Sequence, residues 1–212
     1  MEQYISAIGQ DSHRFVKTDS ENIKTDYVNP ASGDTDNVNP ACGDTDNVNP
    51  TSSDTDNVNP ASGDTDIGGT KKKLILAGVE IPDIEGLDGN SDADVVFHAL
   101  TNAISGISCV NVLGEITDSM CNSGITDSGE YLQYALNTLS DSCIVHVSIS
   151  IECARPKLSP YIAQMRKSIA RRVCISENSV GITATSGEGL TDFGRGLGIQ
   201  VFCIVTARRV AL

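Results

Sequence analysis

The hydrophobic pattern of the chain is regular outside residues 17–73. Apolar runs and strict alternation predict strands, whereas apolar residues spaced three and four apart predict amphipathic helices. On this basis we expect strands at residues 74–81, 144–151, 180–185 and 199–206, and helices at residues 91–107, 129–139 and 160–174. Because strands and helices interleave, the pattern favours one sheet with helices packed against it.

Local signals predict where some of these elements begin and end. Pro82 should produce a turn after the first of these strands. Ser91 is the expected N-cap of the first helix, with Asp94 three residues later in a capping-box position. Near the chain start, Ala7 and Ile8 lead into the stretch GQDSHRF, which we interpret as the end of a short strand.

Residues 27–66 repeat a ten-residue unit four times, as YVNPASGDTD, NVNPACGDTD, NVNPTSSDTD and NVNPASGDTD. The unit consists of turn-forming residues and has one Val to bury, so we predict a disordered low-complexity insertion over residues 17–73. Two Asp in each of four copies give eight of the negative charges behind the net charge of −13. Calcium binding by Asp-Thr-Asp is the alternative, but Val38 occupies the fifth position of an EF-hand pattern and no Gly follows. We therefore favour a solvated tandem expansion.

Composition limits the classes of function. The 212 residues suffice for one domain with a core, and the net charge of −13 argues against a nucleic-acid-binding surface. No apolar run approaches the ~20 residues of a membrane span, and no leader is visible, so a cytoplasmic location is expected. Seven Cys without a C-x-x-C pair make a disulfide framework or a four-cysteine zinc site improbable.

Asp11 and His13 are two residues apart in a predicted strand, so their side chains should share one face. They could be two metal ligands, a histidine with its orienting carboxylate, or an ordinary solvated strand end. His98 on the first predicted helix would complete a two-histidine, one-carboxylate set with an open fourth position, which suits a catalytic zinc. Spacing alone does not bring His98 next to His13. We interpret His146, in a predicted strand, as structural.

Four segments resemble one enzyme family when they are taken together. The segments GQDSHRF, NSDADVVFHAL, RPKLSPYIAQMR and ITATSGEGLTDFGRGLGI occur in the order found in 2-C-methyl-D-erythritol 2,4-cyclodiphosphate synthases, and the resemblance covers nearly all of the chain except residues 17–73. It implies an α+β domain formed by residues 1–16 and 74–212, with a mixed β-sheet covered by helices on one face. It also implies a homotrimer with active sites between subunits.

The resemblance implies a metal-dependent phosphorus–oxygen lyase of the non-mevalonate isoprenoid pathway. Its substrate would be 4-diphosphocytidyl-2-C-methyl-D-erythritol 2-phosphate, whose 2-phosphate attacks the β-phosphate and releases CMP. Asp11, His13 and His98 would bind zinc, and Glu188 would bind magnesium or manganese. A metal between two anionic groups would screen their repulsion and polarise phosphorus.

The remaining site residues are also implied by the resemblance. Asn90 and Ser186 would be catalytic; Thr185 and Ser186 would hold the phosphates; Lys157 would help CMP to leave. Arg195 matches an Arg near the trimer axis, where some members hold an isoprenoid-diphosphate-like ligand. The implied substrate contacts are Ser91, Gly114, Cys153, Ala154, Arg155, Pro156, Lys157, Leu158, Ser159, Thr185 and Arg195.

The sequence also departs from the family pattern. Asn90 replaces a His, Val112-Leu113-Gly114 replaces the Asp-Ile-Gly that grips the erythritol hydroxyls, and Asp192 stands where an aromatic is common. The acidic stretch that follows Gly114 is shortened to residues 116–118. Besides an active synthase, two hypotheses stay open: a zinc-dependent relative acting on another cytidine-diphosphate ester, and a non-catalytic scaffold with the repeat as an interaction segment. The intact metal-ligand set argues against the scaffold.

Overall fold

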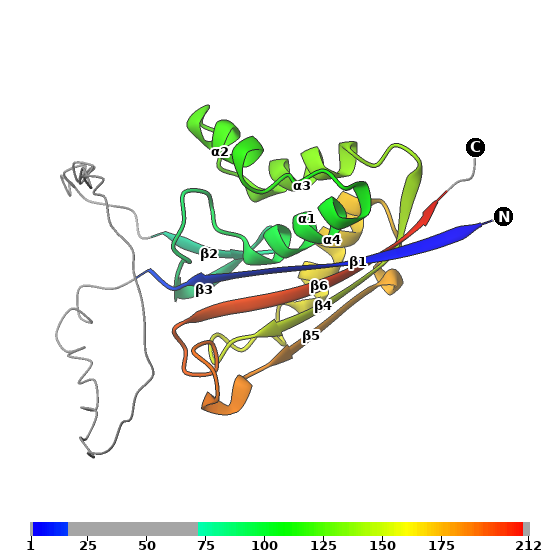
Figure 1. The fold of residues 1–212 in the computed structure, drawn as a ribbon. Helices are drawn as coiled ribbons and strands as arrows, with labels where there is room; N and C mark the ends of the chain where they lie inside the picture. The colour runs from blue at the N-terminus through cyan, green and yellow to red at the C-terminus, as the bar shows by residue number, and fades with distance from the viewer. Residues whose placement is uncertain (1, 17–71, 210–212) are drawn as a thin grey trace, which may run out of the picture. The chain divides into compact units, whose positions relative to one another are not determined.

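The computed structural model describes residues 2–16 and 72–209 (Figure 1). The predicted insertion, apart from its last two residues, and the four repeats lie outside the described residues. In the described part of the chain, no helix has the length and apolar character needed to cross a membrane.

A four-stranded mixed sheet forms the body of the fold, in the order β1-β6-β4-β5. β1 (Gln3–Arg14) and β6 (Gly198–Arg209) pair antiparallel, and they lie side by side in Figure 1 although they come from opposite ends of the chain. β4 (Ser142–Glu152) pairs antiparallel with β6 and parallel with β5 (Val180–Thr185). The mixed sheet is therefore confirmed, while the expectation of a short first strand is wrong, since β1 has 12 residues.

The helices cover one face of this sheet. They are α1 (Val95–Ser108), α2 (Glu115–Asn122), α3 (Ser128–Asn137) and α4 (Ile162–Val173), with 3₁₀ turns at Glu177–Ser179 and Gly187–Gly189. Along β6, Val201, Cys203 and Val205 are buried in the core, whereas the alternate residues Phe202 and Ile204 are exposed. This alternation is the signature of a sheet with one packed and one open face. Helix α2 is the one α-helix in this part of the chain that the apolar pattern did not predict.

A second, two-stranded sheet stands where one strand was predicted. β2 (Lys73–Leu76) and β3 (Val79–Glu85) form a hairpin, so the single strand at 74–81 is wrong, and Pro82 lies inside β3. The turn consists of Ala77 and Gly78, with φ of 54° and 71°. Positive φ at both central residues gives the twist that a two-residue hairpin needs, and Gly at the second position adopts it readily.

Asp94, rather than Ser91, is the N-cap of α1. Its buried carboxylate accepts hydrogen bonds from the backbone N–H groups of Val96 and Phe97 at 3.1 Å. It also accepts from Ala77 at 2.8 Å and Gly78 at 2.6 Å, which ties the hairpin turn to the helix start. Burial raises the pKa of Asp94 to about 6, against the lowering effect of these backbone bonds. Asp94 caps the helix in place of the expected Ser91, because its one carboxylate accepts hydrogen bonds from both the hairpin turn and the first turn of α1.

Gly9 allows α1 to lie directly on β1. A Cβ at this position would stand 2.1 Å from the carbonyl oxygen of Ala99 and 2.3 Å from the backbone nitrogen of Ala103. No larger side chain fits without moving the helix away from the strand. Because Ala99 follows His98, this close approach also brings His98 to the strand that carries Asp11 and His13.

Candidate metal site and nucleotide pocket

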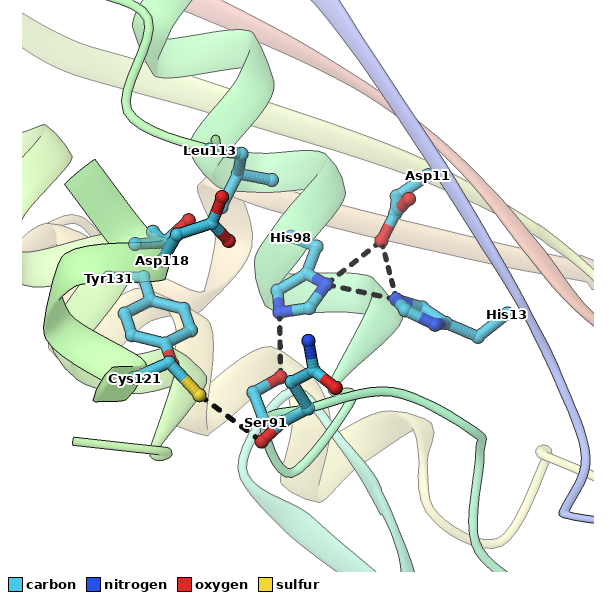
Figure 2. A pocket seen from close by; sticks show the side chains of 10 residues that line it. Asp11, His13, Ser91, His98, Leu113, Asp118, Cys121 and Tyr131 are labelled. Carbon is cyan, nitrogen blue, oxygen red and sulfur yellow. Dashed lines mark hydrogen bonds and ion pairs between the residues drawn. The ribbon is translucent and has the colours of Figure 1, made fainter. Parts of the chain in front are cut away.

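Three side chains from β1 and α1 converge in one cavity (Figure 2). His98 Nδ1 lies 2.9 Å from Asp11 Oδ2, and His13 Nε2 lies 3.1 Å from the same oxygen. The two histidine nitrogens are 3.1 Å apart. The strand prediction that Asp11 and His13 share a face is confirmed, and tertiary packing supplies the third group.

The donor set fits a divalent metal. All three candidate ligand atoms lie within 4.8 Å of one another. Ligands ~2.0–2.1 Å from a tetrahedral zinc are themselves ~3.3 Å apart, so the observed separations of 2.9 to 3.1 Å need only a slight expansion. Two imidazole nitrogens and one carboxylate oxygen are also a ligand combination typical of catalytic zinc. Asp11, His13 and His98 could therefore hold a metal ion.

The electrostatics of the site arise from this mutual contact. Burial alone would raise the pKa of Asp11, but hydrogen bonds and charge from His13 and His98 hold it well below its ordinary value. Burial would lower the pKa of His13, but Asp11 and the backbone carbonyl of Asp88 raise it above the ordinary histidine value. His13 Nδ1 lies 2.7 Å from that carbonyl, which leaves Nε2 directed at the shared point.

The cavity around the three ligands has a volume of about 240 Å³ and a second wall opposite them. Asn90 and Ser91 line it as predicted, with Ser91 Oγ 3.4 Å from His98 Nε2. The other lining residues come from α2, α3 and the loop before them. Leu113, Thr117 and Asp118 belong to the stretch that departs from the family's sugar-binding pattern, whereas Cys121 and Tyr131 had no signal in the sequence. Within α2 only Thr117 is buried, and the helix has just eight mostly polar residues, which is too short and too polar for its few apolar side chains to have revealed it.

Gly114 does not line this cavity, although its neighbour Leu113 does. It is the N-cap residue of α2, with φ of 125°, and its N–H donates to Thr117 Oγ1 at 3.0 Å. In the described chain its visible role is to start the helix that forms the second wall.

A second cavity of about 300 Å³ gathers most of the residues predicted for the nucleotide. It lies where β4 and β5 end, and Ile162 and Ala184 complete its lining. The predicted residues that line it are Cys153, Ala154, Pro156, Lys157, Leu158, Ser159, Thr185 and Ser186. Burial raises the pKa of the Cys153 thiol to about 11, so that thiol is neutral at physiological pH.

Besides Gly114, three predicted site residues lie outside both cavities. Arg155 makes a 2.5 Å ion pair with Glu85, and its guanidinium stands 4.4 Å from the ring centre of Phe15. Arg195 is exposed and pairs with Asp192 at 2.8 Å. Glu188 is exposed in a left-handed conformation, and its carboxylate accepts a 2.7 Å hydrogen bond from Ser186.

His146, interpreted from sequence as structural, is exposed on β4 and lines neither of these two cavities. Among the residues that the structure describes, Asp11, His13 and His98 form the only cluster of three potential metal ligands.

This fold has a counterpart among known proteins. The model of the YgbB family matches residues 62–208, and the chain belongs to that family. More narrowly, the chain is 51% identical over 137 residues to the 2-C-methyl-D-erythritol 2,4-cyclodiphosphate synthase of Chlamydia caviae, covering 64% of this chain and 78% of the relative. The family resemblance drawn from the four sequence segments is thus confirmed.

Solved structures share the fold at low sequence identity. The Plasmodium vivax 2C-methyl-D-erythritol 2,4-cyclodiphosphate synthase matches with a TM-score of 0.61 and 21% identity, covering 99% of this chain and 100% of the other. A CDP complex of the Plasmodium falciparum protein IspF matches with a TM-score of 0.65 and 18% identity, covering 98% and 97%. These matches support the architecture.

Proposed function

We propose that the protein is a metal-dependent cyclodiphosphate synthase, a phosphorus–oxygen lyase of isoprenoid precursor synthesis. The reaction converts 4-diphosphocytidyl-2-C-methyl-D-erythritol 2-phosphate to 2-C-methyl-D-erythritol 2,4-cyclodiphosphate and CMP. The observation that carries the proposal is the convergence of Asp11, His13 and His98 in one cavity of a chain from this family.

In the reaction, an oxygen of the 2-phosphate forms a bond to the β-phosphorus, and the bond from that phosphorus to the bridging oxygen breaks. The electron pair of the broken bond leaves on CMP. A divalent metal held by Asp11, His13 and His98, zinc on the chemistry of the donors, supplies electrophilic polarisation and charge screening when bound. Asn90 and Ser91 line the same cavity and offer neutral hydrogen-bond donors for a phosphate.

The second cavity suits the cytidine half of the substrate. Lys157 brings a positive charge to it that favours departure of CMP, and the hydroxyls of Thr185 and Ser186 can donate to phosphate oxygens. The CDP complex of the Plasmodium falciparum relative supports a nucleotide diphosphate as ligand. A second ion, magnesium or manganese, would bind the diphosphate through Glu188, and Arg195 would lie near the trimer axis.

We propose a homotrimer with active sites between subunits. One row of paired residues crosses all four strands of the sheet: Asp11 on β1, Val201 on β6, Ile151 on β4 and Ala184 on β5. Asp11 lines the metal cavity and Ala184 lines the nucleotide cavity, so the two cavities are three strand spacings apart. At ~4.8 Å per strand this is about 14 Å. If the metal site of one subunit lies next to the nucleotide pocket of a neighbour, both sites can bind the same substrate molecule.

The open face of the sheet supports this assembly. Tyr4, Ile8 and Ile204 are 58%, 64% and 47% exposed, and Phe202 lies among them. Apolar side chains gathered on an exposed sheet face mark an association surface. Subunits joined through this face would bury it.

A specific observation also favours a second candidate, a relative that acts on a different cytidine-diphosphate ester. Val112 is fully buried, Leu113 faces the cavity, and Asp118 and Cys121 form the wall opposite His98. Val112 and Leu113 differ from the pattern that grips erythritol hydroxyls in the family. The ester specificity would then differ while the metal chemistry stays the same.

Product analysis by ³¹P nuclear magnetic resonance tests both candidates. The purified full chain with zinc and magnesium should convert the methylerythritol substrate to CMP and a cyclic diphosphate. Formation of CMP from another cytidine-diphosphate ester, with none from the methylerythritol substrate, would select the second candidate. If no CMP forms from any such ester under conditions where zinc is bound, both are wrong.

A further inference from the structure

His98 has a fixed partner on each side of its ring. Nδ1 faces Asp11 and His13, while Nε2 points the other way, as Figure 2 shows. On that far side Ser128 Oγ lies 2.9 Å from Nε2, closer than Ser91 Oγ at 3.4 Å. Ser128 is fully buried at the first turn of α3, so its hydroxyl is a fixed and dry partner.

The hydroxyl of Ser128 has a second contact, with the carboxylate of Asp92. An ionised carboxylate only accepts hydrogen bonds, and a serine hydroxyl has one proton to donate. Ser128 therefore donates to Asp92, and its oxygen must accept from His98. It follows that His98 carries a proton on Nε2, while Nδ1 is the nitrogen that faces Asp11 and the metal cavity.

Asp92 is itself held in place by backbone groups. Its carboxylate accepts from the N–H of Asp94 at 3.2 Å and from the N–H of Ser128 at 3.3 Å. These bonds do not involve the serine hydroxyl. Removing the hydroxyl therefore interrupts the chain from Asp92 to His98 without removing the backbone anchors of Asp92.

From this geometry we propose that Ser128 and Asp92 are positioning residues that orient His98, fix its tautomer and thereby set the metal affinity of the site. The proposal rests on the metal site of the proposed function. His13 uses a backbone carbonyl, that of Asp88, for the same purpose. Only the His98 branch depends on side chains, so it is the branch that substitution can weaken selectively.

Zinc affinity of the full-length Ser128→Ala protein tests the proposal, measured by competition with a chromophoric chelator. Loss of such an outer partner lowers metal affinity by about 10- to 100-fold, and we expect a loss in that range. Ser105→Ala is the matched control, because Ser105 is also a buried serine but its oxygen accepts from the N–H of Val112 at 3.3 Å. The control should bind zinc as the unmodified protein does.

A second measurement does not require metal. The chain has three histidines, so ¹⁵N resonances of their rings can be assigned in the metal-free protein. We expect His98 to be protonated on Nε2 in the unmodified protein and to lose this fixed tautomer in Ser128→Ala. If Ser128→Ala does not fold, Asp92→Asn replaces it, with an expected loss of zinc affinity of about 3- to 10-fold, since the charge but not the shape is removed.

Two results would overturn the proposal: zinc affinity of Ser128→Ala within about twofold of the unmodified protein, well short of the expected loss, or a His98 whose Nε2 carries no proton in the unmodified, metal-free protein. If the unmodified protein binds no zinc, the metal site of the proposed function fails instead. The tautomer then still decides whether Ser128 and Asp92 orient His98.

Discussion

The two walls of the metal cavity are built differently. One wall comes from β1 and α1, which Gly9 brings into direct contact, and every candidate ligand on it has a hydrogen-bonded partner. The other wall comes from the short helix α2 and the residue Leu113 before it, and Asp118 on that wall is exposed. The ligand wall is fixed by these contacts, whereas the contact that α2 makes across the cavity runs from Cys121 Sγ to the carbonyl oxygen of Asn90 at 3.3 Å, not to a ligand.

This difference suggests that the ligand wall determines the metal chemistry and the α2 wall determines which substrate is accepted. Residues that hold a metal must be positioned within a fraction of an ångström, and rigid elements provide that precision. Residues that only contact the remainder of a substrate can change without affecting the metal. The departures from the family pattern at Val112 and Leu113 accompany the second wall, which agrees with this division.

The largest effect should come from the ligand wall. We expect His98→Ala to lower turnover at least about 1,000-fold by removing one of three metal ligands, with little change in fold. Turnover and bound zinc should be measured together with the circular dichroism spectrum. His146→Ala is the matched control, because this histidine is exposed on β4 outside the cavity. Comparable turnover of the two variants would show that the cluster has no catalytic role.

Asn90 lies at the edge of the same cavity and should matter less. If its amide positions a reacting phosphate, Asn90→Ala should lower turnover by about 10- to 100-fold, as loss of a positioned donor does. Asn90→His, which restores a ring donor, should change turnover only modestly. The rates of both variants should be compared at saturating zinc. Unaltered turnover in Asn90→Ala would remove this residue from the mechanism.

Protons should compete with the metal at the ligand wall. Asp11 and the carbonyl of Asp88 raise the pKa of His13 above the ordinary value of about 6.5 despite its burial. Metal binding needs the neutral ring, so zinc affinity should fall by up to about tenfold per pH unit below that pKa. Titrations between about pH 8 and pH 6 measure this dependence.

The raised pKa of His13 also affects the folding stability of the metal-free protein. This stability should decrease as the pH rises, whereas zinc affinity should increase. Because the folded pKa of His13 is raised, protonated His13 contributes stability that is fully present below about pH 6.5 and is lost as the pH rises through the folded value. In Asp11→Asn this contribution to the free energy of unfolding should shrink. A pH-independent zinc affinity across this range would contradict the assigned role of His13.

The α2 wall should give a smaller and different effect. If the Asp118 carboxylate contacts hydroxyl groups of the substrate, Asp118→Asn should raise KM by roughly 3- to 10-fold and leave zinc affinity unchanged. Glu115→Gln is matched, because Glu115 is also acidic, exposed and in the first turn of α2 but does not line the cavity. Equal KM values for the two variants would show that Asp118 does not contact substrate.

The repeat should give the smallest effect. The chain on either side of residues 17–71 is held at one point: the N–H of Val16 donates to the carbonyl of Gly86 at 2.9 Å, and the N–H of Gly86 donates to the carbonyl of Lys72 at 2.8 Å. A short connection can therefore span the two ends, and lengthening a loop from ~8 to ~50 residues costs only about 1.5 kcal/mol. Replacing residues 27–66 by a Gly/Ser linker should leave turnover and the trimer unchanged.

Turnover, oligomer mass and melting temperature of this deletion should be measured beside those of the full chain. A tenfold fall in turnover or loss of the trimer would mean that the repeat takes part in function.

Most of the sheet and two of the three candidate metal ligands could be predicted from sequence. The strand predicted at residues 180–185 has the same bounds as β5, and the two-residue spacing of Asp11 and His13 correctly placed both side chains on one face. His98 could not be placed in this way, because its approach depends on the absence of a side chain at Gly9. Only the family resemblance linked His98 to the pair.

The errors have equally local causes. Ser91 and Asp94 were both reasonable caps, and the choice depended on the N–H groups of Ala77 and Gly78, far away in sequence. The continuous apolar pattern over residues 74–81 concealed the tight turn that these two residues make. Helix α2 was missed because it has only eight residues, most of them polar, and buries only Thr117.

The central claim is that Asp11, His13 and His98 bind one metal ion that cyclisation requires. Stoichiometric return of zinc to chelator-treated protein, followed by the rate of CMP release in constant magnesium, tests it most directly. The account predicts negligible release without zinc, and a rate that rises linearly and reaches its plateau at about one zinc per chain, as expected for a single three-ligand site. Full CMP release from the zinc-free protein, or restoration by zinc in His98→Ala, would contradict it.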